Sequence, residues 1–406
     1  MAHKKFKKNI TEYYSDSHVS KFQKMPSNYF QKTPIPWLPT PIRMFIQTIF
    51  VIIYAIIILV PLIILKIVGQ IKLKNSQKHS TQTGAAHYIS ATAMSCSCLR
   101  SSLCVLGIID NKLELEMCDW IHKIYVFMML PIFRRSTQMD RSGIKTHLYV
   151  RKFESDALLQ EICDENENSY KNVVMLGAGL DTSFHQFQEK LPENLNLYEV
   201  DSHFCQNYKL EVIANSKKKS KLDWSDKIKY CSVDFESEDF LQKLKESCNF
   251  NPTERTLYLW SGVVMYLDPA AVENCLKRIR QESKSIKSRI FLDTNLDFSS
   301  LENACKGVIA SDPKSRLNYD IQTYKNLLAG VQKMGEPWKF GIPVDDDYPV
   351  HLDNKRCNEA YFELQDYQVV NFLDRKGVNE KYFTMESGEL SGSGLGFCDL
   401  VLIEVA

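Results

Sequence analysis

The sequence predicts an α/β fold built on a doubly wound, mostly parallel sheet. From residue 173 onward, short apolar segments recur at intervals of roughly 25–30 residues, and segments with helical spacing of apolar residues fill the gaps. The first apolar segment, Val173 to Leu176, runs straight into Gly177-Ala178-Gly179 and then Asp181-Thr182. A strand, a glycine turn and a helix start in this order form the junction of a nucleotide-type site.

The elements follow in chain order. Apolar residues at helical spacing predict helices upstream of the sheet, at 87–107, 114–132 and 151–165. Buried strands are predicted at 173–177, 195–200, 228–233, 256–261 and 288–293. The helices between them are predicted at 181–190, 202–215, 236–247 and 269–284. Two further strands, at 367–373 and 397–405, are expected to close the sheet, and 299–345 is expected to add helices over the ligand crevice.

The sequence also divides into domains. Residues 1–43 are polar, basic and proline-containing, which predicts a disordered tail. Residues 44–66 are almost wholly apolar, and about 20 such residues cross a hydrocarbon core, so we predict one transmembrane helix here. A linker at 67–82 and one globular domain at 83–406 follow. This predicts a single-pass membrane protein. Basic residues lie on both sides of the span, so they only slightly favour the orientation in which the large domain is cytosolic.

Composition narrows the functional classes. The formal net charge of +1 gives no electrostatic footprint for nucleic acid. The twelve cysteines lack a C-x-x-C pair, so we predict no metal site, and their scatter fits a reducing compartment.

The ends of the strands indicate the cofactor. Gly177 and Gly179 let the backbone approach a ligand closely. Thr182 stands where a dinucleotide site usually has its third glycine, which favours S-adenosylmethionine because that cofactor has no pyrophosphate. Its ribose needs an acid at the end of the second strand, and either Glu199 or Asp201 can supply one.

The third strand is followed by a possible adenine pocket. Asp234 can accept a hydrogen bond from an adenine amino group, and Phe235 can pack on the ring. A helix-capping role for Asp234 is equally compatible with the acids that follow it.

Together these pieces resemble the leucine carboxyl methyltransferase family of S-adenosylmethionine-dependent O-methyltransferases, and the bacterial-type branch more closely. The similar segments, which span about residues 85–405, are 92–101, 176–182, 199–201, 234–235, 262–267 and 335–342. The resemblance implies a Rossmann-like class I methyltransferase sheet with a helical cap.

The resemblance also implies roles for individual residues. Arg151 would hold the methionine carboxylate of the cofactor, because a guanidinium can bind a carboxylate through two parallel hydrogen bonds. Arg100 would assist. Gly177 would form the cofactor turn and Asp201 would hold the ribose, while Asp234 and Phe235 would form the adenine pocket.

The sequence departs from the family at two positions. Ser261 replaces the glutamate that usually precedes the Gly-Val segment, and Ser183 replaces a frequent arginine after Asp-Thr. A serine cannot supply the charge of a glutamate, so Ser261 raises the question of whether the site still transfers a methyl group.

The functional hypothesis is a membrane-anchored O-methyltransferase that modifies a carboxyl or hydroxyl group of a small molecule or protein. A carboxylate acceptor needs no base, whereas a hydroxyl needs one, and His185 and His203 are the nearest histidines in sequence. The sequence identifies no catalytic residue. Two alternatives remain: a non-catalytic binding protein of the same family, favoured by Ser261, and a nicotinamide-dependent oxidoreductase, disfavoured by Thr182.

Overall fold

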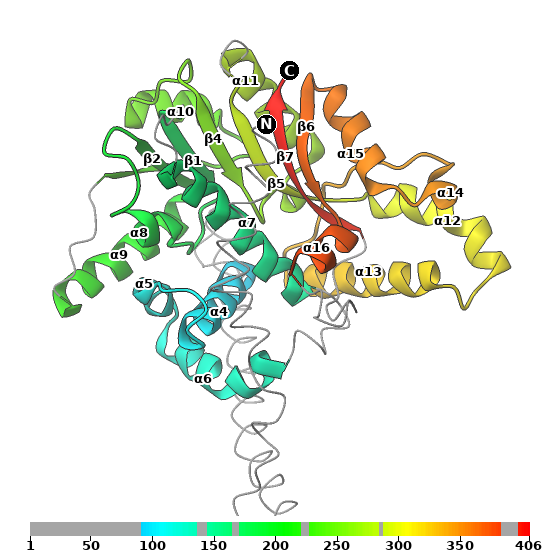
Figure 1. Cartoon of the computed structure of the whole chain (residues 1–406), viewed down its shortest axis with the longest axis horizontal. Helices are drawn as coiled ribbons and strands as arrows, with labels where there is room; N and C mark the ends of the chain where they lie inside the picture. Colours follow the sequence, from blue (N-terminus) through cyan, green and yellow to red (C-terminus); the bar gives the residue numbers. More distant parts are fainter. Residues whose placement is uncertain (1–90, 136–143, 165–169, 221–226, 284–286, 383–396) are drawn as a thin grey trace, which may run out of the picture.

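A seven-stranded mixed sheet forms the centre of the domain (Figure 1). The computed structural model describes residues 91–135, 144–164, 170–220, 227–283, 287–382 and 397–406. The strands are β1 (Asn172–Leu176), β2 (Asn196–Asp201), β3 (Ile228–Ser232), β4 (Thr256–Trp260), β5 (Arg289–Asn295), β6 (Tyr367–Leu373) and β7 (Cys398–Val405). All seven predicted strands are present, so the predicted α/β sheet is confirmed.

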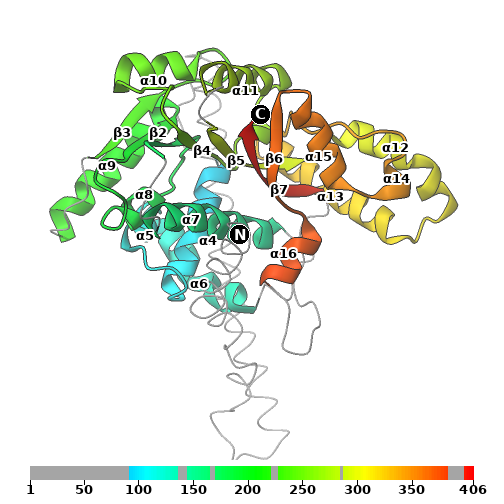
Figure 2. The ribbon, with the colours of Figure 1, turned by 45° about the horizontal axis from the view of Figure 1, so that its top comes forward.

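Helices surround this sheet. They are α4 (Ala91–Val105), α5 (Lys112–Glu116), α6 (Trp120–Arg135), α7 (Ile144–Asp164), α8 (Ser183–Phe187), α9 (His203–Ser220), α10 (Phe240–Cys248) and α11 (Pro269–Ser283), followed by α12 (Phe298–Ser311), α13 (Arg316–Lys333), α14 (Tyr348–His351), α15 (Asn354–Glu363) and α16 (Arg375–Tyr382). A short 3-10 helix, η1 (Val264–Tyr266), follows β4. Two views show helices on both faces of the sheet (Figures 1 and 2).

The strand order is β3-β2-β1-β4-β5-β7-β6, and only β7 pairs antiparallel to its two neighbours. The chain proceeds outward from β1 to β3 and then returns to place β4 on the other side of β1. The order therefore reverses between β1 and β4, and ligands of open α/β sheets bind at the carboxyl edge of such a switch point.

Alternation along β1 separates two apolar cores. Val173 and Met175 pack in the core that contains residues of α7 and α8, whereas Val174 and Leu176 pack in the core that contains residues of α10 and α11. All four side chains are buried. Burial on both faces explains why the strand sequence is continuously apolar rather than alternating.

The N-terminal helices differ from the prediction in two places. The helix expected at 114–132 is divided into α5 and α6, because the Asp119 carboxylate accepts the His122 N–H at 2.9 Å and starts a new helix. Helix α7 begins at Ile144, before the predicted 151, because residues such as Tyr149 and Val150 extend its buried face.

The insertion at 299–345 also differs from the expectation. Helices α12 and α13 form, but they extend to one side of the sheet, next to α14 and α15, and do not cover the crevice (Figures 1 and 2). The segment after α13 does return to the carboxyl edge, where the Lys339 N–H donates to the Met265 carbonyl at 2.7 Å.

The predicted transmembrane helix at 44–66 and the tail before it lie outside the described residues. Among the helices that the structure describes from Ala91 onward, none is both long and apolar enough to cross a membrane.

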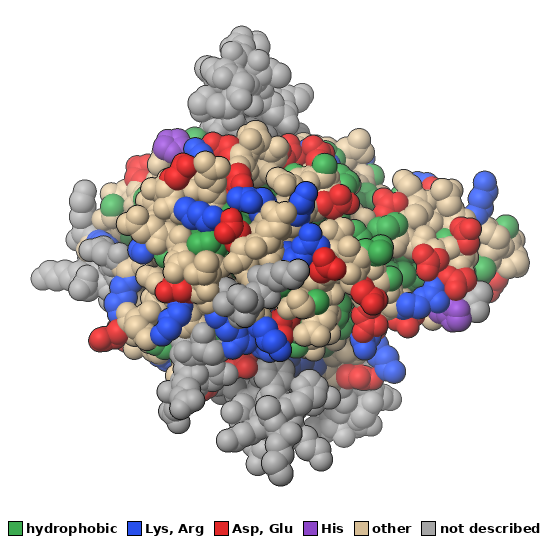
Figure 3. All heavy atoms as spheres, turned by 90° about the horizontal axis from the view of Figure 1, so that it is seen from above, with side chains coloured by type: hydrophobic (Ala, Val, Ile, Leu, Met, Phe, Trp, Pro, Cys, Tyr) green, Lys and Arg blue, Asp and Glu red, His purple; other side chains and the backbone are tan. Residues whose placement is uncertain are grey.

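The end of the sheet away from its carboxyl edge has a surface of mixed charge. Seen from above, this face carries lysines and arginines interspersed with aspartates and glutamates (Figure 3). No single sign of charge dominates it.

A buried ion pair joins β2 to α9 and to the turn after β1. Lys209 Nζ lies 2.5 Å from Glu199 Oε2, both side chains are about 1% exposed, and the same ammonium donates to the Asp181 carbonyl. Removing one partner of such a pair leaves an uncompensated buried charge.

We therefore expect Lys209→Met to lower the free energy of unfolding by about 3–5 kcal/mol. The double variant Lys209→Met/Glu199→Gln, which removes both charges, should recover part of this loss. Chemical denaturation measures both values. A loss in the single variant that the double variant does not reduce would contradict this account of the pair.

Candidate cofactor site at the carboxyl edge of the sheet

The turn after β1 is held against the end of β2 by three backbone amides. The N–H groups of Gly177 and Ala178 donate to the Val200 carbonyl at 2.7 and 3.1 Å. The Gly179 N–H donates to Asp201 Oδ2 at 2.7 Å. The structure thus brings three predicted site residues together, and it ties the acid at the end of β2 to the glycine turn.

Glycine is required in this turn. Gly177 has φ +68° and Gly179 has φ +53°, in the left-handed region that residues with a Cβ rarely adopt. A Cβ on Gly177 would lie 2.1 Å from Val263 Cγ2, in the segment after β4. The two loops at the switch point therefore approach each other as closely as a glycine allows.

The choice between Glu199 and Asp201 follows from their surroundings. Glu199 is fully buried, and its carboxylate forms an ion pair with Lys209 inside the domain. Asp201 is half-buried at the sheet edge, and its carboxylate also accepts the Ser202 N–H at 2.7 Å. Burial raises the pKa of Asp201, while the bonds from Gly179 and Ser202 act in the opposite direction. The ribose role fits Asp201 alone.

Arg151 lies on α7 and reaches the end of β4. Its Nη1 donates to Asp293 Oδ2 at 3.0 Å, and its Nη2 donates to Cys96 Sγ at 3.6 Å. A Cβ on Gly262, which has φ +76°, would lie 2.5 Å from Arg151 Nη1. Of the five N–H donors of a guanidinium, only two are used in these bonds, so others remain for a carboxylate ligand.

Asp293 is the anchor of Arg151, and the sequence reasoning did not single it out. It is fully buried in β5, two residues before the strand ends, and its Oδ1 accepts the Gly262 N–H at 2.5 Å. Burial alone would raise its pKa, but Arg151 and His147 outweigh burial and hold the pKa well below the range of an ordinary aspartate. Asp293 is the last residue of the predicted strand 288–293, as Asp201 directly follows the predicted strand 195–200, and this position was the feature that could have revealed it.

A second charged cluster lies beside the turn. Arg100 Nε donates to Glu114 Oε1 at 2.5 Å, and its Nη1 lies 3.9 Å from Asp181 Oδ2. Burial opposes ionisation of Asp181, but Arg100 and Lys152 outweigh it and keep the pKa well below the usual range. Glu114 is also bonded to Thr182, the residue in the position of the missing third glycine.

Two buried polar atoms test whether the site suits a polar cofactor. Arg100 Nη2 and Ser261 Oγ are among the buried side-chain polar atoms of the described residues that lack a hydrogen-bond partner. Buried polar atoms are normally satisfied. Two unsatisfied groups beside a glycine turn therefore fit a ligand with a carboxylate and an ammonium group.

The two residues predicted to form an adenine pocket lie shortly after β3. Phe235 is half-buried against Phe240, with ring centroids 6.0 Å apart. Asp234 is exposed, and its carboxylate accepts the Glu236 N–H at 3.1 Å and the Ser237 hydroxyl at 2.7 Å. The capping role weighed for Asp234 is therefore present, although α10 itself is capped by Asp239.

Of the two histidines nearest the site in sequence, His185 does not suit a general base. His185 is buried in α8, and burial together with Lys209 lowers its pKa to about 3. His203 is exposed at the start of α9, where its Nε2 lies 2.8 Å from Asn207 Nδ2. A group with a pKa near 3 is a weak base at neutral pH.

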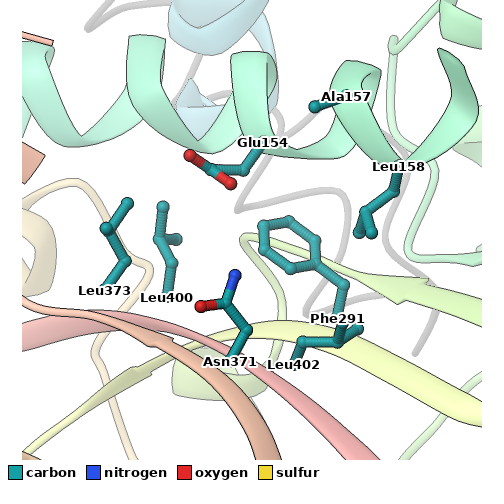
Figure 4. Close-up of a pocket in the computed structure, with 8 residues that line it drawn as sticks. All are labelled: Glu154, Ala157, Leu158, Phe291, Asn371, Leu373, Leu400 and Leu402. Carbon is teal, nitrogen blue, oxygen red and sulfur yellow. The ribbon is translucent and has the colours of Figure 1, made fainter. Parts of the chain in front are cut away.

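A separate small cavity lies between α7 and the sheet face formed by β5, β6 and β7. Its lining is mainly apolar, and the Glu154 carboxylate and the Asn371 amide point into it (Figure 4). The Tyr382 hydroxyl and Lys381 Nζ already bond to Glu154. This cavity is distinct from the glycine turn.

Comparison with known proteins identifies the class of the domain. A family model described as leucine carboxyl methyltransferase matches residues 114–280. These residues contain the glycine turn, Asp201, Asp234 and Ser261. The protein is therefore an S-adenosylmethionine-dependent methyltransferase, and S-adenosylmethionine is its cofactor. Within that class, residues 114–280 are similar to the leucine carboxyl methyltransferase family.

Solved structures resemble the chain only distantly. A DUF574 family protein from Streptomyces avermitilis is 10% identical, with a TM-score of 0.43 over 77% of this chain and 97% of that one. The carbon methyltransferase of CurJ is 15% identical, with a TM-score of 0.36 over 82% and 70%. An O-methyltransferase family 2 protein from Planctomyces limnophilus, solved with apigenin, is 10% identical, with a TM-score of 0.33 over 70% and 69%.

A search of curated protein sequences finds no match to this chain. Because the TM-scores lie below 0.5, the function is inferred from the family match and from the residues of the chain itself. The match leaves the nicotinamide alternative without support.

The close approach at Gly177 makes a direct prediction. Gly177→Ala adds a Cβ at positive φ against Val263, so the turn must shift, and we expect the rise in melting temperature on adding S-adenosylmethionine to disappear. Thermal unfolding with and without cofactor measures this effect.

Gly330→Ala is the matched control, because a Cβ there meets nothing within 4 Å. It lies inside α13, so alanine should stabilise the protein by about 0.5–1 kcal/mol and leave the cofactor effect intact. An unchanged cofactor effect in Gly177→Ala would show that the turn does not contact the cofactor.

Proposed function

We propose that this protein is a membrane-anchored O-methyltransferase that transfers the methyl group of S-adenosylmethionine to a carboxyl or hydroxyl group of a small molecule or protein. The observation that carries the proposal is the meeting of Arg151, the Gly177–Gly179 turn and Asp201 at one switch point, inside a domain of known methyltransferase class. The motif at 335–342 favours the bacterial-type branch of the family.

Each of these residues has a distinct task. Arg151, fixed by Asp293, would hold the carboxylate of the cofactor, and Arg100 lies close enough to the same turn to assist. Asp201 would accept from the ribose hydroxyls, and Phe235 with Asp234 would receive the adenine. The bound cofactor supplies an electrophilic methyl group on a sulfonium, and the protein contributes mainly the position of the acceptor.

The acceptor side of the site is formed by α4 and the segment after α13. The Thr92 N–H, in the first turn of α4, donates to the Glu336 carboxylate at 3.2 Å. Tyr266 and Trp338 pack edge to face nearby, with centroids 6.4 Å apart. A carboxyl acceptor is favoured, because it needs no base and because His185 is poorly suited to act as one.

The membrane anchor rests on the apolar segment 44–66, and the cytosolic side rests on the basic residues that follow it. A tethered enzyme works best on acceptors at the same surface, because tethering raises their effective concentration.

The first test is methyl transfer from radiolabelled S-adenosylmethionine by the full chain into cell extracts, separated into lipid, protein and small-molecule fractions. We expect label in one fraction. Arg151→Lys keeps the charge beside Asp293 but loses the bidentate geometry, so transfer at low cofactor concentration should fall roughly tenfold.

Arg278→Lys is the matched control, because Arg278 pairs with Asp239 at the surface, away from the switch point. It should retain wild-type transfer. Absence of label from every fraction with the wild-type chain, or equal transfer by Arg151→Lys, would contradict the proposed activity.

Ser261 favours a second candidate function, a non-catalytic member that binds the cofactor and a partner. Its hydroxyl is buried at the end of β4, in the position where the family usually has a glutamate. If Ser261 suffices for catalysis, Ser261→Glu should change the transfer rate by less than about tenfold.

The same radiolabel assay, run beside a calorimetric titration of the cofactor, decides between the two functions. A wild-type chain that binds S-adenosylmethionine without transferring methyl, and that gains transfer in Ser261→Glu, would establish the non-catalytic function. Transfer by the wild type to any acceptor would exclude it.

A further inference from the structure

Helix α6 carries an apolar face that the domain does not cover. Trp120, Ile124 and Phe127 are 70%, 46% and 51% exposed. Their spacing of four and three residues places them on one side of the helix. We call these three residues the α6 face.

The other side of α6 is already occupied. Val126 is fully buried, in a cluster with Cys98 of α4 and Cys118 of the α5–α6 connection. A helix that is apolar on both sides is normally buried or in contact with a second apolar surface.

The remaining large apolar side chains that are exposed in the described residues are dispersed. They are Leu210, Val308, Tyr319, Met334, Leu352 and Leu364, on different helices and connections. Single exposed apolar residues are ordinary on a soluble surface, whereas a row of them marks a contact site. The α6 face is therefore the candidate contact site.

We propose that the α6 face lies on the surface of a lipid bilayer, on the same side of the domain as the cofactor site. This inference rests on the proposed membrane anchor. Helix α6 has a tryptophan and a phenylalanine on one face, and its sequence ends with Arg134 and Arg135. Aromatic residues and basic residues in this combination characterise helices that lie in the interface of an anionic membrane.

Chain connectivity supports the bilayer over other occupants. The predicted span ends at residue 66, and α4 begins at Ala91. The 24 residues between them span at most about 85 Å when fully extended, which limits how far α4 can lie from the predicted span. Helix α4 packs directly on α6, and both lie at the carboxyl-edge side of the sheet (Figures 1 and 2).

Helix α4 links the α6 face to the cofactor site. Its Cys96 contacts Arg151, and its Arg100 contacts Glu114 and Asp181. With the α6 face on the bilayer, α4 lies between the lipid surface and the cofactor. An acceptor held at that surface then lies on the side of the domain that carries the cofactor site.

Photo-cross-linking of the full chain in vesicles of phosphatidylcholine and phosphatidylserine tests this arrangement. p-Benzoylphenylalanine replaces Ile124 in one variant and Leu364 in the matched control. Leu364 is 83% exposed and follows α15, on the other side of the domain from α6. Mass spectrometry of the peptide that contains the label identifies its partner.

We expect lipid adducts at position 124 roughly tenfold more often than at position 364. Cross-links from position 124 into another segment of this chain, into a second copy, or into nothing would overturn the inference. Equal lipid labelling at both positions would overturn it as well.

Alkaline extraction of the same vesicles separates this result from the anchor itself. A chain that resists extraction while position 124 stays unlabelled retains the anchor and loses the α6 contact. A chain that is extracted lacks the anchor. The radiolabel assay reports methyl transfer independently of both.

Discussion

The arrangement of the site depends on the bonds between the turn after β1 and the end of β2. Gly177 and Ala178 donate to Val200, and Gly179 donates to Asp201. Only residues without a Cβ fit this path, because φ is positive at both glycines and Val263 fills the space beside Gly177. The same three bonds fix the acid of β2 relative to the glycine turn after β1, so the ribose and the rest of a cofactor would meet prearranged partners.

Charge balance around this turn is maintained by pairs of buried groups. Arg151 is held by Asp293, Arg100 by Glu114, and Lys209 by Glu199. A buried charge without a partner would be strongly destabilising, and each pair provides that partner. Arg151 and Arg100 each have further N–H donors, and an anionic ligand can accept hydrogen bonds from them. The two arginines of the site can therefore bind a cofactor in addition to their carboxylate partners.

Much of the fold could be predicted from local sequence. The seven strands were predictable because burial on both faces makes them continuous apolar runs, and the glycine turn was predictable because it directly follows one of them. The break between α5 and α6 was not, since it depends on a single capping aspartate within an unbroken helical pattern.

The site was predictable only where its residues lie at strand ends. Asp201 and the two glycines follow that rule, and Asp293 follows it too, although its role emerges only from contact with Arg151, which lies far away in sequence. Glu114 gives no local indication at all, because its importance comes from Arg100 and Thr182 meeting it in space. Long-range ion pairs of this kind are invisible to periodicity and spacing.

The central claim is that the edge formed by β1, β2 and β4 is an S-adenosylmethionine site. The most direct measurement is a calorimetric titration of the full chain with S-adenosylmethionine, compared with a titration with a reduced nicotinamide dinucleotide. The account predicts saturable binding of S-adenosylmethionine at one site per chain and no binding of the dinucleotide. No heat of binding at saturating S-adenosylmethionine, or equal binding of both compounds, would contradict it.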